Sequence, residues 1–165
     1  MKKTGVFYGS STGNTESIAK SIAKKLNAEL YSVDKNPINE VRQCQNLILG
    51  TSTWGLGDLQ DDWEGFLPWL CDIDLSGKTI ALFGLGDSSS YPDTFVNGMG
   101  TIYGSLKGKG CTIVGAVDPG GYEFDDSTAI VDGKFVGLPL DEDNENDQSD
   151  ERVGKWLQQI IPDFD

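Results

Sequence analysis

Short apolar runs of strand length alternate with amphipathic helical patterns along this chain. The strand-like runs lie at residues 5–8, 28–33, 46–50, 78–84 and 111–115. Between and after them, apolar residues recur every three or four positions, as on one face of a helix, around residues 18–26, 41–42, 61–70, 95–106 and 149–161. This βαβαβαβαβα order predicts an α/β fold in three layers, a doubly wound five-stranded parallel sheet with helices on both faces.

The apolar runs differ in how deeply we expect them to be buried. The continuous runs at residues 46–50, 78–84 and 111–115 are typical of strands buried on both faces. Residues 28–33 alternate between apolar and polar, which favours a position nearer the edge of the sheet. We therefore expect one domain over residues 1–165, with its core on both sides of a parallel sheet.

Residues 118–139 interrupt this rhythm. They carry Pro119-Gly120-Gly121 and a hairpin signal at Asp132-Gly133, so we expect an insertion there that interrupts the last strand. The acidic residues 141–151 that follow predict a mostly solvated face, and Ser149 is placed to cap the last helix.

Three polar loops follow the carboxyl ends of predicted strands, at residues 9–15, 51–60 and 85–93. In open α/β sheets, ligands bind beyond the carboxyl ends of the strands, where the strand order reverses. We name these segments the hydroxyl loop, the Trp54 loop and the Tyr91 loop, and we expect them to meet at one rim of the sheet.

The hydroxyl loop has the composition of an anion site. It carries two glycines, four hydroxyls and one amide, and it leads into a helix whose N-terminus attracts negative charge. Its residues are Gly9, Ser10, Ser11, Thr12, Gly13, Asn14 and Thr15. No lysine or arginine lies between Lys3 and Lys20, which excludes the GxxxxGK[ST] loop of nucleoside triphosphatases, and the GxGxxG fingerprint is absent. A ligand with a terminal monophosphate fits this loop better than a nucleoside triphosphate or a dinucleotide does. The alternative interpretation is that these polar residues only cap the helix.

Each of the other two loops carries one aromatic residue. Trp54 lies in Thr53-Trp54-Gly55-Leu56-Gly57, and Tyr91 follows Gly86-Asp87. Two aromatic side chains beside an anion site could stack on both faces of a planar ring system. The alternative interpretation is that both side chains only shield the rim.

Composition narrows the possible functions. The chain has a formal net charge of −13 and no histidine, which argues against nucleic acid and anionic membranes as partners and excludes histidine-based catalysis or metal binding. Its three cysteines are widely spaced, which argues against a disulfide framework and against a metal site. This spacing favours a location in the reducing cytoplasm. No apolar stretch reaches the roughly 18 residues of a membrane span, and we expect no membrane insertion.

The three loops together resemble those of the flavodoxin family. The matching segments are Gly9-Ser10-Ser11-Thr12-Gly13-Asn14-Thr15-Glu16, Thr53-Trp54-Gly55-Leu56-Gly57, and Gly84-Leu85-Gly86-Asp87 with Tyr91-Pro92. The insertion and the segment 137–144 resemble the long-chain subgroup. The resemblance covers nearly the whole chain and implies the strand order 2-1-3-4-5.

The resemblance also implies a ligand, non-covalently bound FMN, and the residues that would bind it. The phosphate would be held by Ser10, Ser11, Thr12, Gly13, Asn14 and Thr15. Trp54 and Tyr91 would cover the two faces of the ring, and Asp143 would reach the ribityl chain. The other residues expected at the flavin are Thr53, Gly55, Leu56, Gly57, Gly86, Asp87 and Phe95. The chain departs from the family pattern at Ser88 and Ser90, where many relatives carry Gln and Gly. The resemblance therefore does not fix the conformation of this loop near flavin N5.

The resemblance implies an electron carrier rather than an enzyme. It would be a low-potential, one-electron carrier that shuttles between the semiquinone and the hydroquinone and substitutes for ferredoxin, as a cytoplasmic monomer. Candidate partners are redox proteins with basic docking faces: ferredoxin/flavodoxin-NADP reductase, pyruvate oxidoreductase, photosystem I or nitrogenase reductase.

The leading alternative is an NAD(P)H:quinone or flavin reductase of the same fold. A phosphoacceptor receiver domain is a second alternative, but it needs carboxylates after the first and third strands. This chain has Gly9-Ser10 and Gly50-Thr51 there, which argues against that function.

Overall fold

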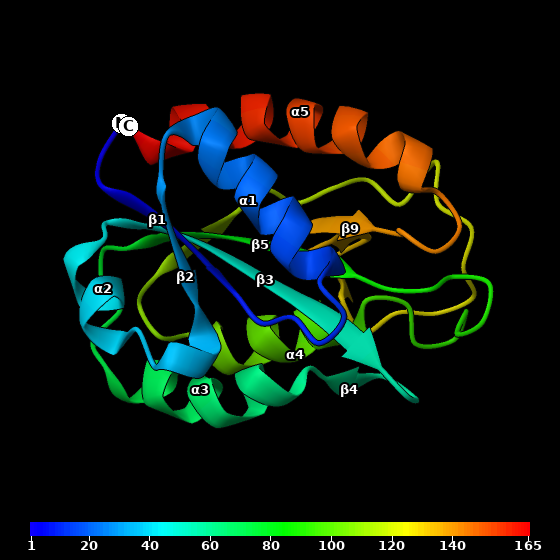
Figure 1. The fold of residues 1–165 in the computed structure, drawn as a ribbon, viewed down its shortest axis with the longest axis horizontal. Coiled ribbons are helices and arrows are strands. Elements are labelled where there is room, and N and C mark those ends of the chain that lie inside the picture. The colour runs from blue at the N-terminus through cyan, green and yellow to red at the C-terminus, as the bar shows by residue number, and fades with distance from the viewer.

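The computed structural model describes all residues, Met1–Asp165, and shows one central sheet between two helical layers (Figure 1). The strands of this sheet are β1 (Thr4–Tyr8), β2 (Glu29–Ser32), β3 (Asn46–Trp54), β4 (Asp58–Leu59), β5 (Thr79–Leu85), β6 (Thr112–Val114) and β9 (Leu138–Leu140). The α-helices are α1 (Asn14–Leu26), α2 (Ile38–Gln43), α3 (Asp61–Asp72), α4 (Asn97–Leu106) and α5 (Ser149–Ile160). Single 3₁₀ turns lie at Val33–Lys35, Asn146–Gln148 and Ile161–Phe164.

The sheet is doubly wound, as predicted. Its order is β2-β1-β3-β5-β6 and every pairing along this path is parallel. The last position is shared by two strands: β6 pairs with the start of β5 (Thr79↔Thr112), and β9 pairs with its end (Phe83↔Leu138). The order 2-1-3-4-5 and the interrupted last strand are both confirmed.

The insertion begins and ends two or three residues earlier than predicted. It runs from residue 115 to residue 137 and contains the small hairpin β7 (Ile130–Val131) and β8 (Lys134–Phe135). Pro139 lies inside β9, which a proline tolerates because β9 is at the edge of the sheet and pairs only with β5. The prediction that residues 111–115 form a buried strand is wrong, since β6 is a half-exposed edge strand.

More than half of the predicted loop at residues 51–60 is strand, namely residues 51–54 and 58–59. β3 continues to Trp54 and then pairs antiparallel with β4 (Trp54↔Asp58), so Gly55, Leu56 and Gly57 form the tip of a hairpin. Thr51 and Ser52 are buried because β5 extends beside them. Their polar side chains concealed this continuation of the strand.

The two faces of the sheet carry separate apolar cores. Helices α1 and α5 cover one face, and α3 and α4 cover the other (Figure 1). The first core gathers around Ile22 and Trp156, the second around Leu49 and Trp63. None of the helices combines the length and the apolar character needed to cross a membrane.

The last helix begins differently from the prediction. Ser149 is the first residue of α5 rather than its cap, and its hydroxyl bonds the carboxylate of Glu142. Ser149 and Asp141 are both buried, so the segment 141–151 is not simply a solvated acidic face.

Close packing at the centre of the sheet gives a first prediction. Gly50 on β3 pairs with Phe83 on β5, and a Cβ at Gly50 would lie 2.0 Å from Cζ of Phe83. We expect Gly50→Ala to lower the free energy of unfolding by about 1–3 kcal/mol through overpacking, measured by urea denaturation. In the control Gly65→Ala, on α3, the new Cβ meets no atom within 4 Å, and we expect a gain of about 0.5–1 kcal/mol. A neutral Gly50→Ala would contradict this packing.

Candidate ligand-binding site

The three loops meet at the carboxyl ends of β1, β3 and β5 and enclose a cavity of about 400 Å³. The residues that line this cavity are Thr12, Asn14, Thr15, Ser52, Thr53, Trp54, Gly55, Leu85, Gly86, Asp87, Tyr91, Glu142 and Asp143. No lysine or arginine is among them. The structure thus brings the anion site and both aromatic residues together, as the sequence pattern predicts.

Most of the residues predicted to bind the ligand line the cavity, and six do not. Ser10, Ser11 and Gly13 lie in the same turn as Thr12, just outside the lining. Leu56 projects from the hairpin tip with 84% of its surface exposed, and Gly57 lines a neighbouring surface hollow instead. The sixth residue is Phe95.

Phe95 lies outside the cavity, because it is packed into an aromatic cluster under the insertion. Its ring is 5.6 Å from that of Phe124 and 6.0 Å from that of Phe135, and only 1% of its surface is exposed. It nevertheless supports the site, since a Cβ on Gly86 would lie 3.0 Å from its ring. The helical pattern could not distinguish such a supporting residue from one that touches a ligand.

The hydroxyl loop offers unpaired backbone donors to an anion. The hydroxyl of Ser10 accepts from the N–H of Gly13 at 3.0 Å, and Gly13 has φ +95°, a conformation that favours glycine. Within residues 9–16, the backbone N–H groups that find no acceptor within the protein are those of Ser10, Ser11, Thr12, Asn14, Thr15 and Glu16. Together with the helix dipole of α1, they form a site for an anion without any cationic side chain.

The residue that caps the start of α3 contacts the hydroxyl loop and supports it. Gln60, 1% exposed, caps α3 by accepting from the N–H groups of Asp62 and Trp63 through Oε1. Its amide donates to the hydroxyl of Ser11 at 3.2 Å. A Cβ on Gly9 would lie 2.1 Å from Gln60 Oε1, so only glycine fits there. Sequence reasoning missed Gln60 because glutamine is an uncommon N-cap.

One aromatic side chain reaches the cavity from the end of β3 and the other from the loop that follows β5. The indole N–H of Trp54, at the end of β3, donates to the Ser52 hydroxyl at 2.8 Å. Trp54 is 40% exposed and Tyr91 44% exposed, which is unusual for aromatic side chains that have a core within reach. A planar ligand between them would bury both surfaces, and this arrangement fits the predicted stacking better than rim packing.

Three carboxyl groups, those of Asp87, Glu142 and Asp143, also line the cavity. Partial desolvation acts to raise the pKa of Asp87, but hydrogen bonds from the Ser90 N–H and the Asn144 amide outweigh it and lower the pKa. Asp143 behaves oppositely: desolvation, and then the nearby carboxyls of Asp87, Asp141 and Glu142, raise its pKa. The sequence missed Glu142, Ser52 and Leu85 as lining residues.

The three cysteines take no part in the site. Cys44 is buried, Cys71 and Cys111 are half-buried, and none forms a disulfide. Burial raises the pKa of each thiol, which keeps it protonated and unreactive. This agrees with a packing role.

The fold and this cavity define the class: a doubly wound α/β protein whose three strand-end loops form one ligand site. A family model described as Flavodoxin matches residues 6–156. The flavodoxin of Synechocystis sp. is 43% identical over 98% of this chain and 98% of its own length, and that of Helicobacter pylori is 44% identical over 99% of both. The chain belongs to the flavodoxin family.

A solved structure supports the assignment at the level of the backbone. Fusobacterium nucleatum flavodoxin superimposes with a TM-score of 0.94 at 33% identity, covering 100% of both chains, and that crystal structure has flavin mononucleotide bound.

Crowding of carboxyl groups at the cavity gives a second prediction. Because the folded-state pKa of Asp143 lies above its ordinary value of 3.8, the ionised side chain destabilises the folded state above that pKa. We expect Asp143→Asn to raise the melting temperature of the ligand-free protein at pH 7, and the gain to shrink as the pH falls toward 4. A gain that grows on acidification would contradict this sign. Thermal unfolding at several pH values measures it.

Proposed function

We propose that this protein is a low-potential, one-electron carrier that binds FMN non-covalently, with residues 1–165 acting as one unit. The observation that carries this proposal is the cavity that joins an uncharged anion site to two half-exposed aromatic side chains. The FMN found in the related F. nucleatum flavodoxin has a terminal phosphate and a planar ring, the two features that such a cavity selects.

The phosphate of FMN fits the hydroxyl loop. Its dianion would accept from the free N–H groups of Ser11, Thr12, Asn14, Thr15 and Glu16. It would also accept from the side chains of Thr12, Asn14 and Thr15, which line the cavity. Ser10 would act mainly by shaping the turn, since its hydroxyl already accepts from Gly13. Hydrogen bonds to a charged group are the stronger kind, so several such bonds can replace a missing lysine.

The ring would lie between Trp54 and Tyr91, bordered by the backbone of Gly55 and Gly86. FMN supplies the one-electron chemistry, and the protein supplies position and electric field. Asp87, Glu142 and Asp143 line the same cavity, and no cation does. Negative charge nearby disfavours addition of an electron to the ring, which supports a low potential, with the protein working between the one- and two-electron-reduced levels.

The aromatic residues also weigh against the alternative, an NAD(P)H:quinone or flavin reductase. A reductase needs an open ring face on which a nicotinamide or quinone can lie. Trp54 and Tyr91 enter the cavity from two different loops, and side chains on both faces would leave a second substrate little room.

The surface charge supports redox proteins with basic docking faces as partners. The net charge of −13 favours electrostatic steering of such partners toward the flavin edge. We propose that the protein acts in the cytoplasm, substitutes for ferredoxin, and serves one of the partners named above, such as a ferredoxin/flavodoxin-NADP reductase.

Anaerobic reductive titration of the FMN-loaded protein, followed by visible absorbance, tests this function. We expect two resolved one-electron steps, the second at low potential. Conversion in one step by NADPH alone would favour the reductase, and failure to bind FMN would refute the proposal.

Binding measurements test the anion site separately. Because a Cβ on Gly9 would collide with Gln60, we expect Gly9→Ala to weaken FMN binding about tenfold or more, equivalent to about 1.4 kcal/mol. Riboflavin, which lacks the phosphate, should lose much less affinity. In the control Gly154→Ala, on α5, the added methyl group meets no atom within 4 Å. This control should change the affinity for neither FMN nor riboflavin. Equal losses for FMN and riboflavin would show that the hydroxyl loop does not bind the phosphate.

Docking can be tested with a strongly basic c-type cytochrome as electron acceptor. Asp58 and Asp61 are exposed beside the Trp54 loop, whereas Glu29 and Asp163 are exposed at the opposite rim, near the amino ends of the strands. We expect Asp58→Asn/Asp61→Asn to slow electron transfer about two- to tenfold at low ionic strength and to flatten its salt dependence. The control Glu29→Gln/Asp163→Asn removes the same charge and should have a smaller effect. Equal effects would indicate that only net charge matters.

A further inference from the structure

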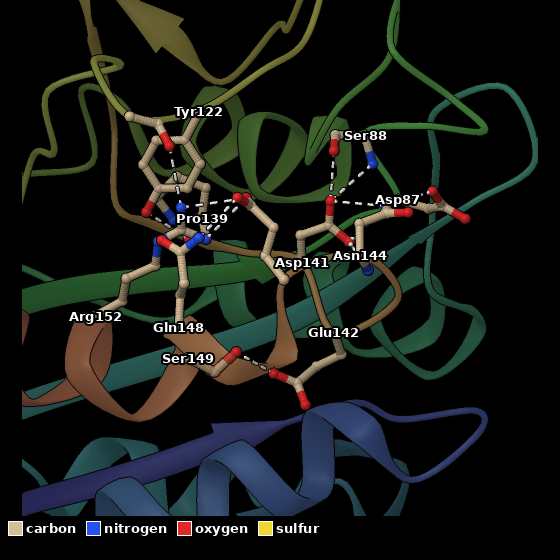
Figure 2. Close-up of polar contacts among 12 residues, drawn as sticks. Asp87, Ser88, Tyr122, Pro139, Asp141, Glu142, Asn144, Gln148, Ser149 and Arg152 are labelled. Carbon is tan, nitrogen blue, oxygen red and sulfur yellow. Dashed lines mark hydrogen bonds and ion pairs between the residues drawn. The ribbon is translucent and has the colours of Figure 1, made fainter.

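Asp141, the residue directly after β9, is a buried acidic residue between two loops of the site. Its relative exposure is 0%, and none of the five ion pairs of the protein includes it. Its Oδ2 accepts from both the N–H, at 3.1 Å, and the hydroxyl of Ser88. The backbone N–H and the amide of Asn144 each donate to its carboxyl group at 3.0 Å (Figure 2). Asp141 therefore joins the Tyr91 loop to the segment after β9.

Further hydrogen bonds extend this junction to the aromatic residue. The Asn144 amide also donates to Asp87 Oδ1 at 2.9 Å, and the same oxygen accepts from the N–H of Ser90 at 3.0 Å. The backbone carbonyl of Asp87 accepts from the N–H of Tyr91 at 2.9 Å. A continuous set of bonds thus leads from buried Asp141, through Asp87, to the backbone that carries Tyr91.

The insertion contacts β9, the strand that directly precedes Asp141. Tyr122 donates its hydroxyl to the carbonyl of Pro139 at 2.8 Å, two residues before Asp141 (Figure 2). The guanidinium of Arg152 lies 4.1 Å from the centre of the Tyr122 ring and bonds Glu145 and the carbonyl of Gly121. Burial, against the opposing effect of Arg152, raises the pKa of Tyr122 to about 12, so its hydroxyl remains a donor at neutral pH.

We propose that Asp141 is a positioning residue that holds the Tyr91 loop against the ring of FMN through Ser88 and Asn144, and that the insertion supports it through Tyr122. This role rests on the FMN binding proposed above. A loop held at Ser88 and Asp87 has few alternative conformations, so Tyr91 and the neighbouring backbone keep one place relative to the ring. Loss of the junction admits water to the ring and weakens the penalty on its negative charge.

Two serines in the same loop provide a matched test. Ser88→Ala removes a hydroxyl bonded to Asp141, whereas Ser89→Ala removes an exposed hydroxyl that has no partner. In the ligand-free protein we expect Ser88→Ala to speed amide hydrogen exchange at residues 87–91 by about tenfold, as expected for loss of a bond to a charged group. In the FMN-loaded protein we expect the second one-electron potential to rise. Ser89→Ala should change neither quantity, and Ser88→Thr, which keeps the hydroxyl, should restore both.

Two further variants test the rest of the junction. Asp141→Asn places an amide N–H₂ group against the donors of Ser88 or Asn144, and it should exceed Ser88→Ala in both effects. Tyr122→Phe, which loses only the bond to Pro139, should act in the same direction more weakly. Asp141→Asn can also destabilise the folded protein. The comparison of Ser88→Ala with Ser89→Ala therefore decides whether Asp141 positions the Tyr91 loop.

The outcomes separate this inference from the proposed function. If Ser88→Ala matches Ser89→Ala in both exchange and potential, the positioning role of Asp141 is refuted while FMN binding stands. If the unsubstituted protein binds no FMN, the proposed function and the flavin role fail together, and the exchange rates of the ligand-free protein still decide whether Asp141 holds the loop.

Discussion

Parallel pairing of β1, β3 and β5 is the constraint on which the rest of this structure depends. It places the carboxyl ends of three strands at one edge of the sheet, so three loops far apart in sequence border one cavity. The same pairing buries polar Thr51 and Ser52 beside β5, and antiparallel pairing with β4 then carries β3 as far as Trp54. The hydroxyl loop and both aromatic residues therefore follow or end central strands of the sheet, which position a site more precisely than free loops do.

The site combines two opposite electrostatic features. The free N–H groups of the hydroxyl loop and the dipole of α1 attract an anion. Asp87, Glu142 and Asp143 line the same cavity and contribute negative charge, with no cationic side chain among the lining residues. A ligand with a phosphate and a planar ring meets both the anion donors and the aromatic side chains of this cavity.

Support for the site comes from residues that touch no ligand. Gln60 holds the hydroxyl loop against α3, Phe95 packs behind Gly86, and Asp141 joins the Tyr91 loop to β9. The insertion, which has no chemistry readable from its sequence, contacts β9 through Tyr122. Except for the contact between Phe95 and Gly86, these contacts link segments that are distant along the chain, so positions next to the cavity are set by packing elsewhere.

The sequence by itself determined the strand and helix order, the doubly wound topology, and the identity of the hydroxyl loop, Trp54 and Tyr91, because periodicity and loop composition are local signals. Tertiary structure decided the rest. Phe95 lies outside the cavity although it is near Tyr91 in sequence, since the aromatic side chains of the insertion surround it. Asp141 is buried although it opens an acidic segment, because Ser88 and Asn144 supply the donors that burial of a carboxyl group requires. Such long-range partners leave no mark in local patterns.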